Sequence, residues 1–338
     1  MEKRKAIEQL WQECFGDSET FVRFYFDRKY RDEDALLYEQ DGKPTAAFLM
    51  LPYTIAWKGQ SLKSAYISGA CTQANARNQG IMGRLLQRGF QEMAKRGAEL
   101  SFLIPAEEWL YGYYGESGYT TVFYRQEEVW EDQTGQNEEA GETAIYTHAG
   151  EVPLEEIFPY FEKKLAERDC YVCHPREDFQ TILGDLFLSG GKLFVIRREH
   201  ICGMALAVQE GKGCKVKEIC YDMPEDKEKL LHAVAVCWKN QRVVFRGRED
   251  KKGMPYGMAR LIRVPEALET FARCYPSAEF AVEVEDRLLP GNNGVFYLRE
   301  GHCTGTGHAV PQKMDVCELT QYLLTYQGIC PYMNLMID

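Results

Sequence analysis

The sequence predicts a mixed α/β (α+β) protein with more than one domain. Its length of 338 residues exceeds that of most single domains. One stretch, residues 64–95, has the pattern of a strand, a glycine-containing turn and an amphipathic helix. A series of two helices, a meander of strands, a helix and a strand occurs twice along the chain. These observations favour two similar α/β units followed by a further α+β unit.

Residues 64–95 are the most informative part of the sequence. A strand is predicted over residues 65–72, and the helix after it has an apolar face formed by Ile81, Leu85, Leu86, Phe90 and Met93. Gly80 and Gly83 lie where the chain enters the helix. Backbone without side chains lets an anion approach the unpaired N–H groups of the first helical turn. The segment could therefore bind pyrophosphate, although a tight turn at Gly80 and a solvated Arg77 would give the same pattern.

The turn itself, RNQGIMG at residues 77–83, resembles the acetyl-CoA motif R/Q-x-x-G-x-G/A of the GNAT acyltransferases. Met82 stands at the second small position, a departure that is similar to the Eis-like (enhanced intracellular survival) branch of that superfamily. The resemblance implies that the turn holds the pyrophosphate of acetyl-CoA through its backbone amides, with support from two side chains. The residues concerned are Arg77, Asn78, Gln79, Gly80, Ile81, Met82 and Gly83. It also implies that backbone groups of Ala70, Cys71 and Thr72 hold the pantetheine and polarise the thioester carbonyl.

The elements around this segment fit the same family. Helices are expected over residues 3–15 and 18–30, the second capped by Asp17 or Ser18. Turns at residues 41–42 and 58–59 separate strand patterns, which cover residues 35–38, 45–51, 53–57, 64–72 and 100–104. Two helices, a meander and a strand–turn–helix are the GNAT order. Residues 1–130 are therefore expected to form a catalytic GNAT domain.

A tyrosine-rich segment follows the last of these strands. Residues 113–119, YYGESGY, resemble the F/Y-Y-x-x-x-G-F/Y segment of GNAT enzymes, and Tyr114 falls on the first tyrosine of the Eis-like pattern Y-x-x-x-G-Y. The resemblance implies that Tyr114 is the general acid that returns a proton to the departing CoA thiolate. A phenol suits this role because it donates its proton at a pKa of about 10. The alternative is that Tyr114 only packs, as we expect for Tyr111, Tyr113 and Tyr119.

Two further domains are predicted after the polar, acidic residues 131–143. Residues 131–250 repeat the order of the first unit without its acetyl-CoA motif. We expect them to form a degenerate GNAT-like domain that contributes to the acceptor cleft. Residues 251–338 resemble the sterol-carrier-protein-like domain of Eis-like proteins, chiefly through the loop PGNNG at residues 290–294. In that family the domain is structural and completes the active site, so no lipid ligand is expected.

The last residues, PYMNLMID at 331–338, are unusually apolar for a chain terminus, because termini commonly fray in water. In the Eis-like family the terminal carboxylate is buried in the catalytic domain and deprotonates the acceptor amine. The resemblance implies this role for the α-carboxylate of Asp338. A charged last side chain departs from the aromatic residue of the best-known members, so either carboxylate of Asp338 is a candidate base.

The amino-acid composition indicates which partners the protein could bind and in which cellular compartment it is expected. Lys and Arg number 40 against 51 Asp and Glu, a net charge of −11, which argues against nucleic acid or an anionic membrane as partner. No apolar run approaches the ~20 residues of a membrane helix, and residues 1–30 do not resemble a signal peptide. The 12 cysteines are scattered, which favours a cytoplasmic protein with free thiols. The haem-attachment pattern CYVCH at residues 170–174 is interpreted as chance, and no metal site is predicted.

Together these patterns predict an N-acetyltransferase that moves acetyl from acetyl-CoA directly to a primary amine of a small cationic acceptor, of the aminoglycoside or polyamine type. Acetyl-CoA is the expected co-substrate, and the family resemblance is compatible with a homo-oligomer. A covalent intermediate on Cys71 is disfavoured because no histidine lies near it in the sequence. Two alternatives remain open: transfer to a lysine of a peptide or protein, and a non-catalytic acyl-CoA-binding module.

Overall fold

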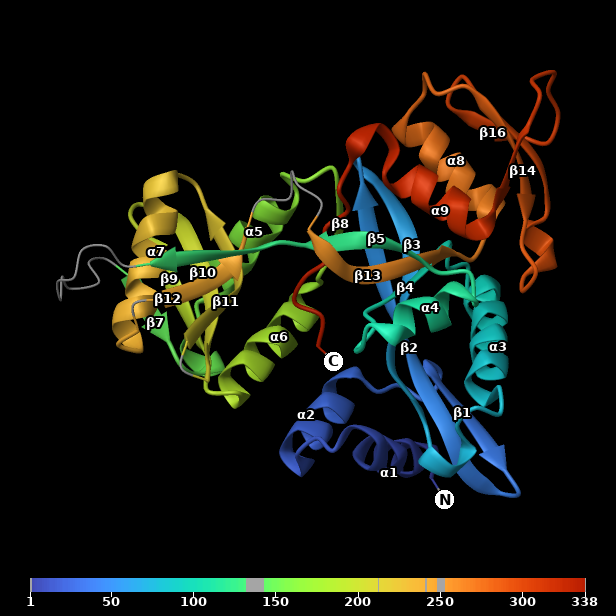
Figure 1. Ribbon diagram of the computed structural model, residues 1–338. Helices are drawn as coiled ribbons and strands as arrows, with labels where there is room; N and C mark the ends of the chain where they lie inside the picture. The colour runs from blue at the N-terminus through green and yellow to red at the C-terminus, as the bar shows by residue number, and fades with distance from the viewer. Residues whose placement is uncertain (1, 132–142, 212, 241, 248–252, 338) are drawn as a thin grey trace.

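The computed structural model describes residues 2–131, 143–211, 213–240, 242–247 and 253–337. These residues form three β-sheets, and each sheet has helices packed on it (Figure 1). In this view the first sheet lies in the middle, the second to its left and the third at the upper right. The protein is thus of the mixed α/β class that the sequence predicts.

The first sheet combines strands from three distant parts of the chain. Its order is β1–β2–β3–β4–β13–β5, and β8 pairs with β2 beyond the end of β1. The strands are β1 Ala35–Gln40, β2 Lys43–Trp57, β3 Gln60–Thr72, β4 Leu100–Leu103, β5 Thr120–Arg125, β8 Cys170–Val172 and β13 Met254–Leu261. β3 and β4 are parallel, and the other pairs are antiparallel.

Helices cover both faces of this sheet. α1 Lys3–Phe15 and α2 Glu19–Lys29 pack on one face, which we call the α1 face, and α3 Ile81–Lys95 and α4 Trp109–Gly115 pack on the other, the α3 face. Ser18 caps α2 by accepting a hydrogen bond from the Phe21 amide, as predicted. α3 buries the apolar face that its spacing predicts. No helix in the described part of the chain is long and apolar enough to cross a membrane.

The hairpin of β2 and β3 is longer than predicted. The sequence predicts two strands here, residues 45–51 and 53–57, on either side of Pro52, because proline has no N–H to donate within a sheet. In the structure β2 continues through Pro52, which lies between the part of β2 that pairs with β1 and the part that pairs with β8. Lys58 and Gly59 both have positive φ and form the tight turn of the hairpin.

The second sheet has the order β6–β12–β11–β10–β9–β7. Its strands are β6 Glu127–Glu131, β7 Thr143–Tyr146, β9 Lys192–Arg197, β10 Ile201–Glu210, β11 Gly213–Tyr221 and β12 Arg242–Arg246. α5 Leu154–Leu165 and α6 Arg176–Leu188 pack on one face, and α7 Pro224–Cys237 packs on the other. From α5 to β12 the helices and strands follow the order that the sequence predicts. β8 was not predicted, and it pairs with β2 of the first sheet although it lies between α5 and α6 in the chain.

The third sheet has the order β16–β15–β14–β17. It comprises β14 Phe280–Glu285, β15 Gly294–Arg299, β16 His302–Thr304 and β17 Gln312–Asp315, with α8 Val264–Cys274 and α9 Val316–Leu324 against it. β13 lies within the range 251–338 that was expected to form the sterol-carrier-like domain, but it pairs in the first sheet, between β4 and β5. Successive residues of β13 are buried, as in a central strand with both faces covered. The expected range 251–338 therefore contributes to two sheets.

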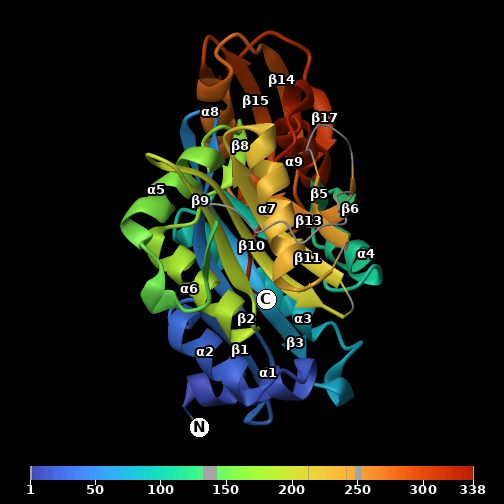
Figure 2. The same ribbon diagram turned by 90° about the vertical axis from the view of Figure 1, so that its left-hand side faces the viewer.

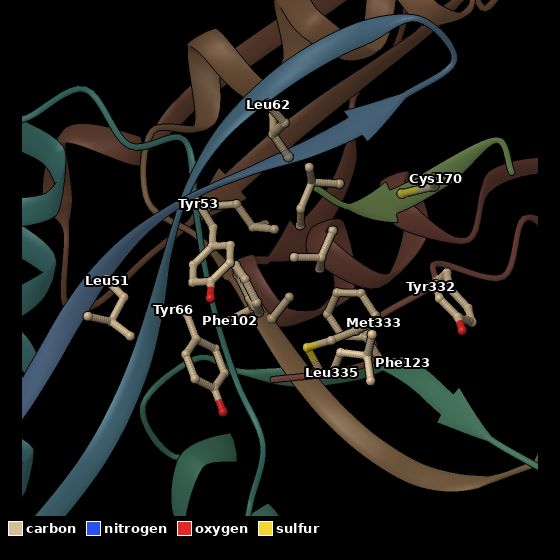
Figure 3. Close-up of a cluster of buried hydrophobic side chains, with 14 of the residues drawn as sticks. Leu51, Tyr53, Leu62, Tyr66, Phe102, Phe123, Cys170, Tyr332, Met333 and Leu335 are labelled. Carbon is tan, nitrogen blue, oxygen red and sulfur yellow. The ribbon is translucent and has the colours of Figure 1, made fainter. Parts of the chain in front are cut away.

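The end of the described chain lies in the middle of the molecule, whereas its start lies at the edge (Figures 1 and 2). We refer to residues 331–337 as the tail. Tyr332 bridges to β8, because its amide donates to the Cys170 carbonyl at 2.8 Å and its carbonyl accepts from the Val172 amide at 2.9 Å. Met333 and Leu335 then pack near Phe123 in a buried cluster on the α1 face (Figure 3). The tail is thus part of the core and not a frayed end.

Candidate active site

β3 and β4 separate in the middle of the first sheet. They pair only over residues 64–66 and 100–102, after which β4 ends at Leu103 while β3 continues to Thr72. The other edge of β3 stays paired with β2 along this length. Within the described chain, residues 67–72 of β3 therefore have no partner strand on the side of β4. Such an opening leaves backbone hydrogen-bonding groups available to a ligand.

The residues predicted to hold the pantetheine lie on this open stretch of β3. Ala70 packs towards the α3 face and Cys71 towards the α1 face, as expected for neighbours in a strand. The Thr72 carbonyl already accepts a hydrogen bond from Arg77 Nε at 3.1 Å and one from the Cys14 thiol at 3.5 Å. Arg77 therefore braces the loop against β3.

Gly69 allows α1 to approach this part of β3. Its φ is 62°, and a Cβ at this position would lie 2.0 Å from the ring of Trp11. The register of β2 and β3 shifts at the same point. Gly69 is not among the residues predicted for the site, although a glycine inside a strand pattern indicates a bulge or a close approach of two segments.

The start of α3 follows the opening after a short loop. Asn78 and Gly80 have positive φ values of 62° and 69°, and Gly80 is the N-cap without a side-chain hydrogen bond. Gln79 Nε2 donates to the Asn75 carbonyl at 3.2 Å, so this side chain stabilises the loop. Among the described residues, no side chain caps the first turn of α3, whose N-cap Gly80 has no side chain of its own. Uncapped N–H groups at a helix start suit an anion.

The last three residues of the predicted motif differ in the groups that a bound ligand could contact. Ile81 is buried, and Met82 packs partly against the same cluster, so their backbone is the part that remains for a ligand. Gly83 has open space beside it, because a Cβ there would meet no atom within 4 Å. Packing within the protein therefore does not explain why position 83 is a glycine.

Tyr114 lies on α4 at the α3 face. Its side chain is 7% exposed, and its ring packs against Tyr113 and Tyr119 at centroid distances of 5.4 and 5.9 Å. Its hydroxyl has no hydrogen-bond partner among the described residues, whereas that of Tyr119 bonds to Ser101 at 2.7 Å. Burial raises the pKa of Tyr114, with smaller contributions from Tyr113 and Cys71. The phenol is therefore protonated at neutral pH and can donate its proton.

Cys71 faces Cys14 of α1. A hydrogen bond between the two thiols, assisted by Arg77, lowers the pKa of Cys14 to about 7. The same hydrogen bond and burial raise the pKa of Cys71 well above its ordinary value. Cys71 is thus a poor nucleophile, and Cys14 is the more acidic thiol. Cys14 could not be recognised from the sequence, because the packing of α1 on β3 is what brings it to this site.

Asp338, the predicted base, lies outside the described residues. A cavity of about 220 Å³ lies beside the tail, between α6, β10, β11 and the ends of β5 and β13. Its charged lining consists of Arg125, Asp185, Glu210, Lys215 and Lys217. This mixture is not the acidic lining that a small cationic acceptor would favour. Neither Tyr114 nor any residue of β3 is among the described residues that line it, whereas residues 334–337 of the tail are.

Two family models match the sequence. Residues 2–122 match an acetyltransferase (GNAT) domain, and residues 264–329 match a sterol carrier protein domain. No curated protein matches the sequence. The opening, the start of α3 and Tyr114 all lie within the first matched range. The chain therefore contains a GNAT acetyltransferase domain followed by a C-terminal sterol carrier protein domain, and the predicted enzyme class, a GNAT-type N-acetyltransferase, is confirmed.

Solved structures share this fold over nearly the whole chain. A GCN5-related N-acetyltransferase from Anabaena variabilis has a TM-score of 0.75 at 16% identity and covers 98% of this chain and 97% of its own. A probable N-acyltransferase from Enterococcus faecalis V583 has a TM-score of 0.74 at 17% identity, with 95% and 87% covered. Eis1 from Mycobacterium abscessus has a TM-score of 0.70 at 16% identity, with 96% and 87% covered. The resemblance to the Eis-like arrangement is thus confirmed at the level of the fold.

Proposed function

We propose that the protein transfers the acetyl group of acetyl-CoA directly to a primary amine. The opening between β3 and β4 carries this proposal. On its α3 face lie the uncapped start of α3 and the phenol of Tyr114, and on its α1 face lies the buried cluster that includes the tail. Donor and acceptor would meet through the gap in the sheet.

The GNAT fold binds acyl-CoA, and the residues at this opening fit that ligand. Backbone amides of residues 78–83 would hold the pyrophosphate, and the space beside Gly83 would admit it. Backbone groups of Ala70 and Cys71 on the unpaired edge of β3 would hold the pantetheine. Arg77 and Gln79 would support the loop through the hydrogen bonds that they make within it.

The reaction proposed at the opening forms one bond and breaks one. The amine nitrogen attacks the thioester carbonyl, a C–N bond forms and the C–S bond breaks. N–H groups of β3 stabilise the charge that develops on the carbonyl oxygen. Tyr114 gives its proton to the CoA thiolate, and a base takes the proton of the amine. Asp338 stays the predicted base.

The acceptor that we propose is a small cationic amine of the aminoglycoside or polyamine type. The net charge of −11 supports this class, because an acidic protein attracts polycations. The acceptor would approach from the α1 face, whose buried cluster includes Cys71, Tyr66 and residues of the tail. Transfer to a peptide lysine is the other candidate.

Release of CoA from acetyl-CoA over a panel of aminoglycosides, polyamines and lysine-containing peptides tests this function. Tyr114→Phe is expected to lower kcat by about 10²- to 10⁴-fold, the range for loss of a general acid, with unchanged affinity for acetyl-CoA. Tyr113→Phe on the same helix is the matched control and is expected to keep its activity. Binding of acetyl-CoA without turnover of any amine would instead support a non-catalytic binding module.

A further inference from the structure

A buried polar cluster lies where α2, β2, α6 and the tail meet. Lys29 at the end of α2 forms an ion pair with Asp178 of α6, and Asp178 contacts His174. The side chains of the three are 11%, 8% and 2% exposed. Tyr53 of β2 donates to the Asp178 carboxylate at 3.1 Å. We refer to Lys29, Asp178 and His174 as the relay.

His174 connects the relay to the backbone of the tail. Its Nδ1 lies 2.6 Å from Asp178 Oδ2, and its Nε2 lies 2.9 Å from the carbonyl oxygen of Asn334. In the sequence, His174 is distinguished only as the last residue of CYVCH. In the structure it joins two segments that lie far apart in the sequence.

The hydrogen bond to the tail fixes the tautomer of His174. A carbonyl oxygen can only accept, so Nε2 carries a proton and donates it to Asn334. Burial lowers the pKa of His174 to about 4, and the nearby Lys29 acts in the same direction, while the Asn334 carbonyl opposes them. The imidazole is therefore neutral at neutral pH, with its proton on Nε2. The titratable groups that face it are Asp178, Lys29 and Tyr53.

Further hydrogen bonds hold the tail, and Asn334 is the last of its described residues for which a hydrogen bond is seen. Arg246 donates to the Met333 carbonyl at 2.7 Å, and the Asn334 side chain donates to the Lys217 carbonyl at 2.6 Å and to Glu218 at 2.9 Å. The chain then turns at Leu335, whose φ of 56° is unusual for a residue with a side chain. Such a conformation persists where the surrounding structure determines it.

The turn directs Leu335 to the place where the sheet opens. Leu335, Tyr53, Tyr66 and Phe102 belong to one buried cluster, and Figure 3 shows them around a common centre. Tyr66 and Phe102 are the last paired residues of β3 and β4 before the opening. The segment that the relay anchors is therefore next to the gap in the sheet.

We propose that Lys29, Asp178 and His174 are positioning residues for acetyl transfer, which hold the Asn334 carbonyl and thereby set residues 335–337 against the opening between β3 and β4. The reaction in this statement rests on the proposed function. Burial of an ion pair gives no general gain in stability, since apolar residues of similar volume are often as stable. A role in positioning the tail would explain why the polar side chains of the relay are buried at this site.

The kinetic test compares His174→Phe, His174→Gln and Lys29→Met. His200→Gln, at an exposed turn of the second sheet, is the matched control. We expect His174→Phe and Lys29→Met to lower kcat about 10- to 100-fold, the scale of a misplacement near 1 Å, and to leave the KM for acetyl-CoA unchanged. His174→Gln retains a donor for Asn334 and should recover part of the rate. Equal rates in His174→Phe and the control, or equal losses in His174→Phe and His174→Gln, would overturn the proposal.

Two measurements test the relay without any acceptor. Hydrogen exchange followed by mass spectrometry is expected to be faster at residues 335–337 in His174→Phe than in His200→Gln, and equal exchange would overturn the anchoring. ¹⁵N spectra of the histidine side chains should show His174 as the neutral tautomer with its proton on Nε2 at neutral pH. A bare Nε2 would overturn the hydrogen bond to Asn334. Faster exchange in a protein that acetylates no amine would refute the proposed function and support the anchoring.

Discussion

Arg260 of β13 and Asp286 form a buried ion pair that attaches the third sheet to the first. Arg260 Nη2 donates to both carboxylate oxygens, at 2.9 and 2.8 Å, and both side chains are 1% exposed. Asp286 also accepts from the Asn292 side chain at 2.8 Å. Asn292 belongs to the loop PGNNG, so the segment that most resembled the sterol-carrier domain in the sequence is also the one that carries this attachment.

Asp286→Ala is expected to lower the free energy of unfolding by about 3–5 kcal/mol, because it leaves the Arg260 guanidinium buried without a counter-charge. Urea unfolding followed by tryptophan fluorescence measures the change. Arg287→Ala, in the exposed pair with Glu285, is the control and should leave the unfolding midpoint where it is. A similar small change in both variants would show that the ion pair is not critical to the attachment.

The pH dependence of kcat should reflect the raised pKa of Tyr114. A general acid is active while it is protonated, so its loss on the alkaline side follows its pKa. Because burial raises that pKa, the alkaline limb should lie above the ordinary tyrosine value of about 10. Rates measured from neutral pH up to the limit of stability check this. An alkaline limb at lower pH that Tyr114→Phe leaves in place would assign it to another group.

Cys14 should be the fast-reacting member of its pair. Its pKa of about 7 predicts half-maximal alkylation by iodoacetamide near neutral pH, with the rate rising as the pH passes through that value. Peptide mass spectrometry distinguishes it from Cys71, whose pKa is raised. Arg77→Ala should slow the reaction of Cys14 at pH 7, because it removes a cation that favours the thiolate. Alkylation of Cys71 ahead of Cys14 would contradict this assignment.

Gly83→Ala separates protein packing from ligand binding. A methyl group at Gly83 meets no protein atom within 4 Å, and alanine favours a helix over glycine by about 1 kcal/mol. The variant should therefore be at least as stable as the parent protein. If the pyrophosphate occupies this space, the variant should bind acetyl-CoA more weakly, as isothermal calorimetry can measure. Unchanged affinity would remove Gly83 from the cofactor site.

The sequence was most informative where the signal is local. The periodicity of α3, the Ser18 cap and the glycine at the helix start depend on neighbours within a few residues, and the structure shows these features. The residues predicted around Tyr114 and on β3 do lie at one opening, although their roles stay predictions. A family motif made this possible, since periodicity alone would have left Tyr114 as a core residue.

The pairing of strands that lie far apart in the chain could not be predicted from the sequence. β8 has three residues and β13 has eight, and nothing in either strand indicates that both belong to the first sheet. The contact of Cys14 with Cys71 depends on how α1 lies over Gly69. The role of His174 could not be predicted for the same reason, because its partners are Asp178 of α6 and Asn334 of the tail. Such contacts follow from the packing of whole elements, which local patterns do not encode.

The membership of β13 in the first sheet has a consequence for how the chain is made. Among the strands that the structure describes, β13 alone connects β4 to β5, so the two cannot be joined until the ribosome has produced residue 261. A nascent chain that ends near residue 130 contains the GNAT motifs but exposes two apolar strand edges, which are sites of aggregation. The acetyltransferase domain should therefore mature late in translation, after the second unit has emerged, although most of its sequence is synthesised first.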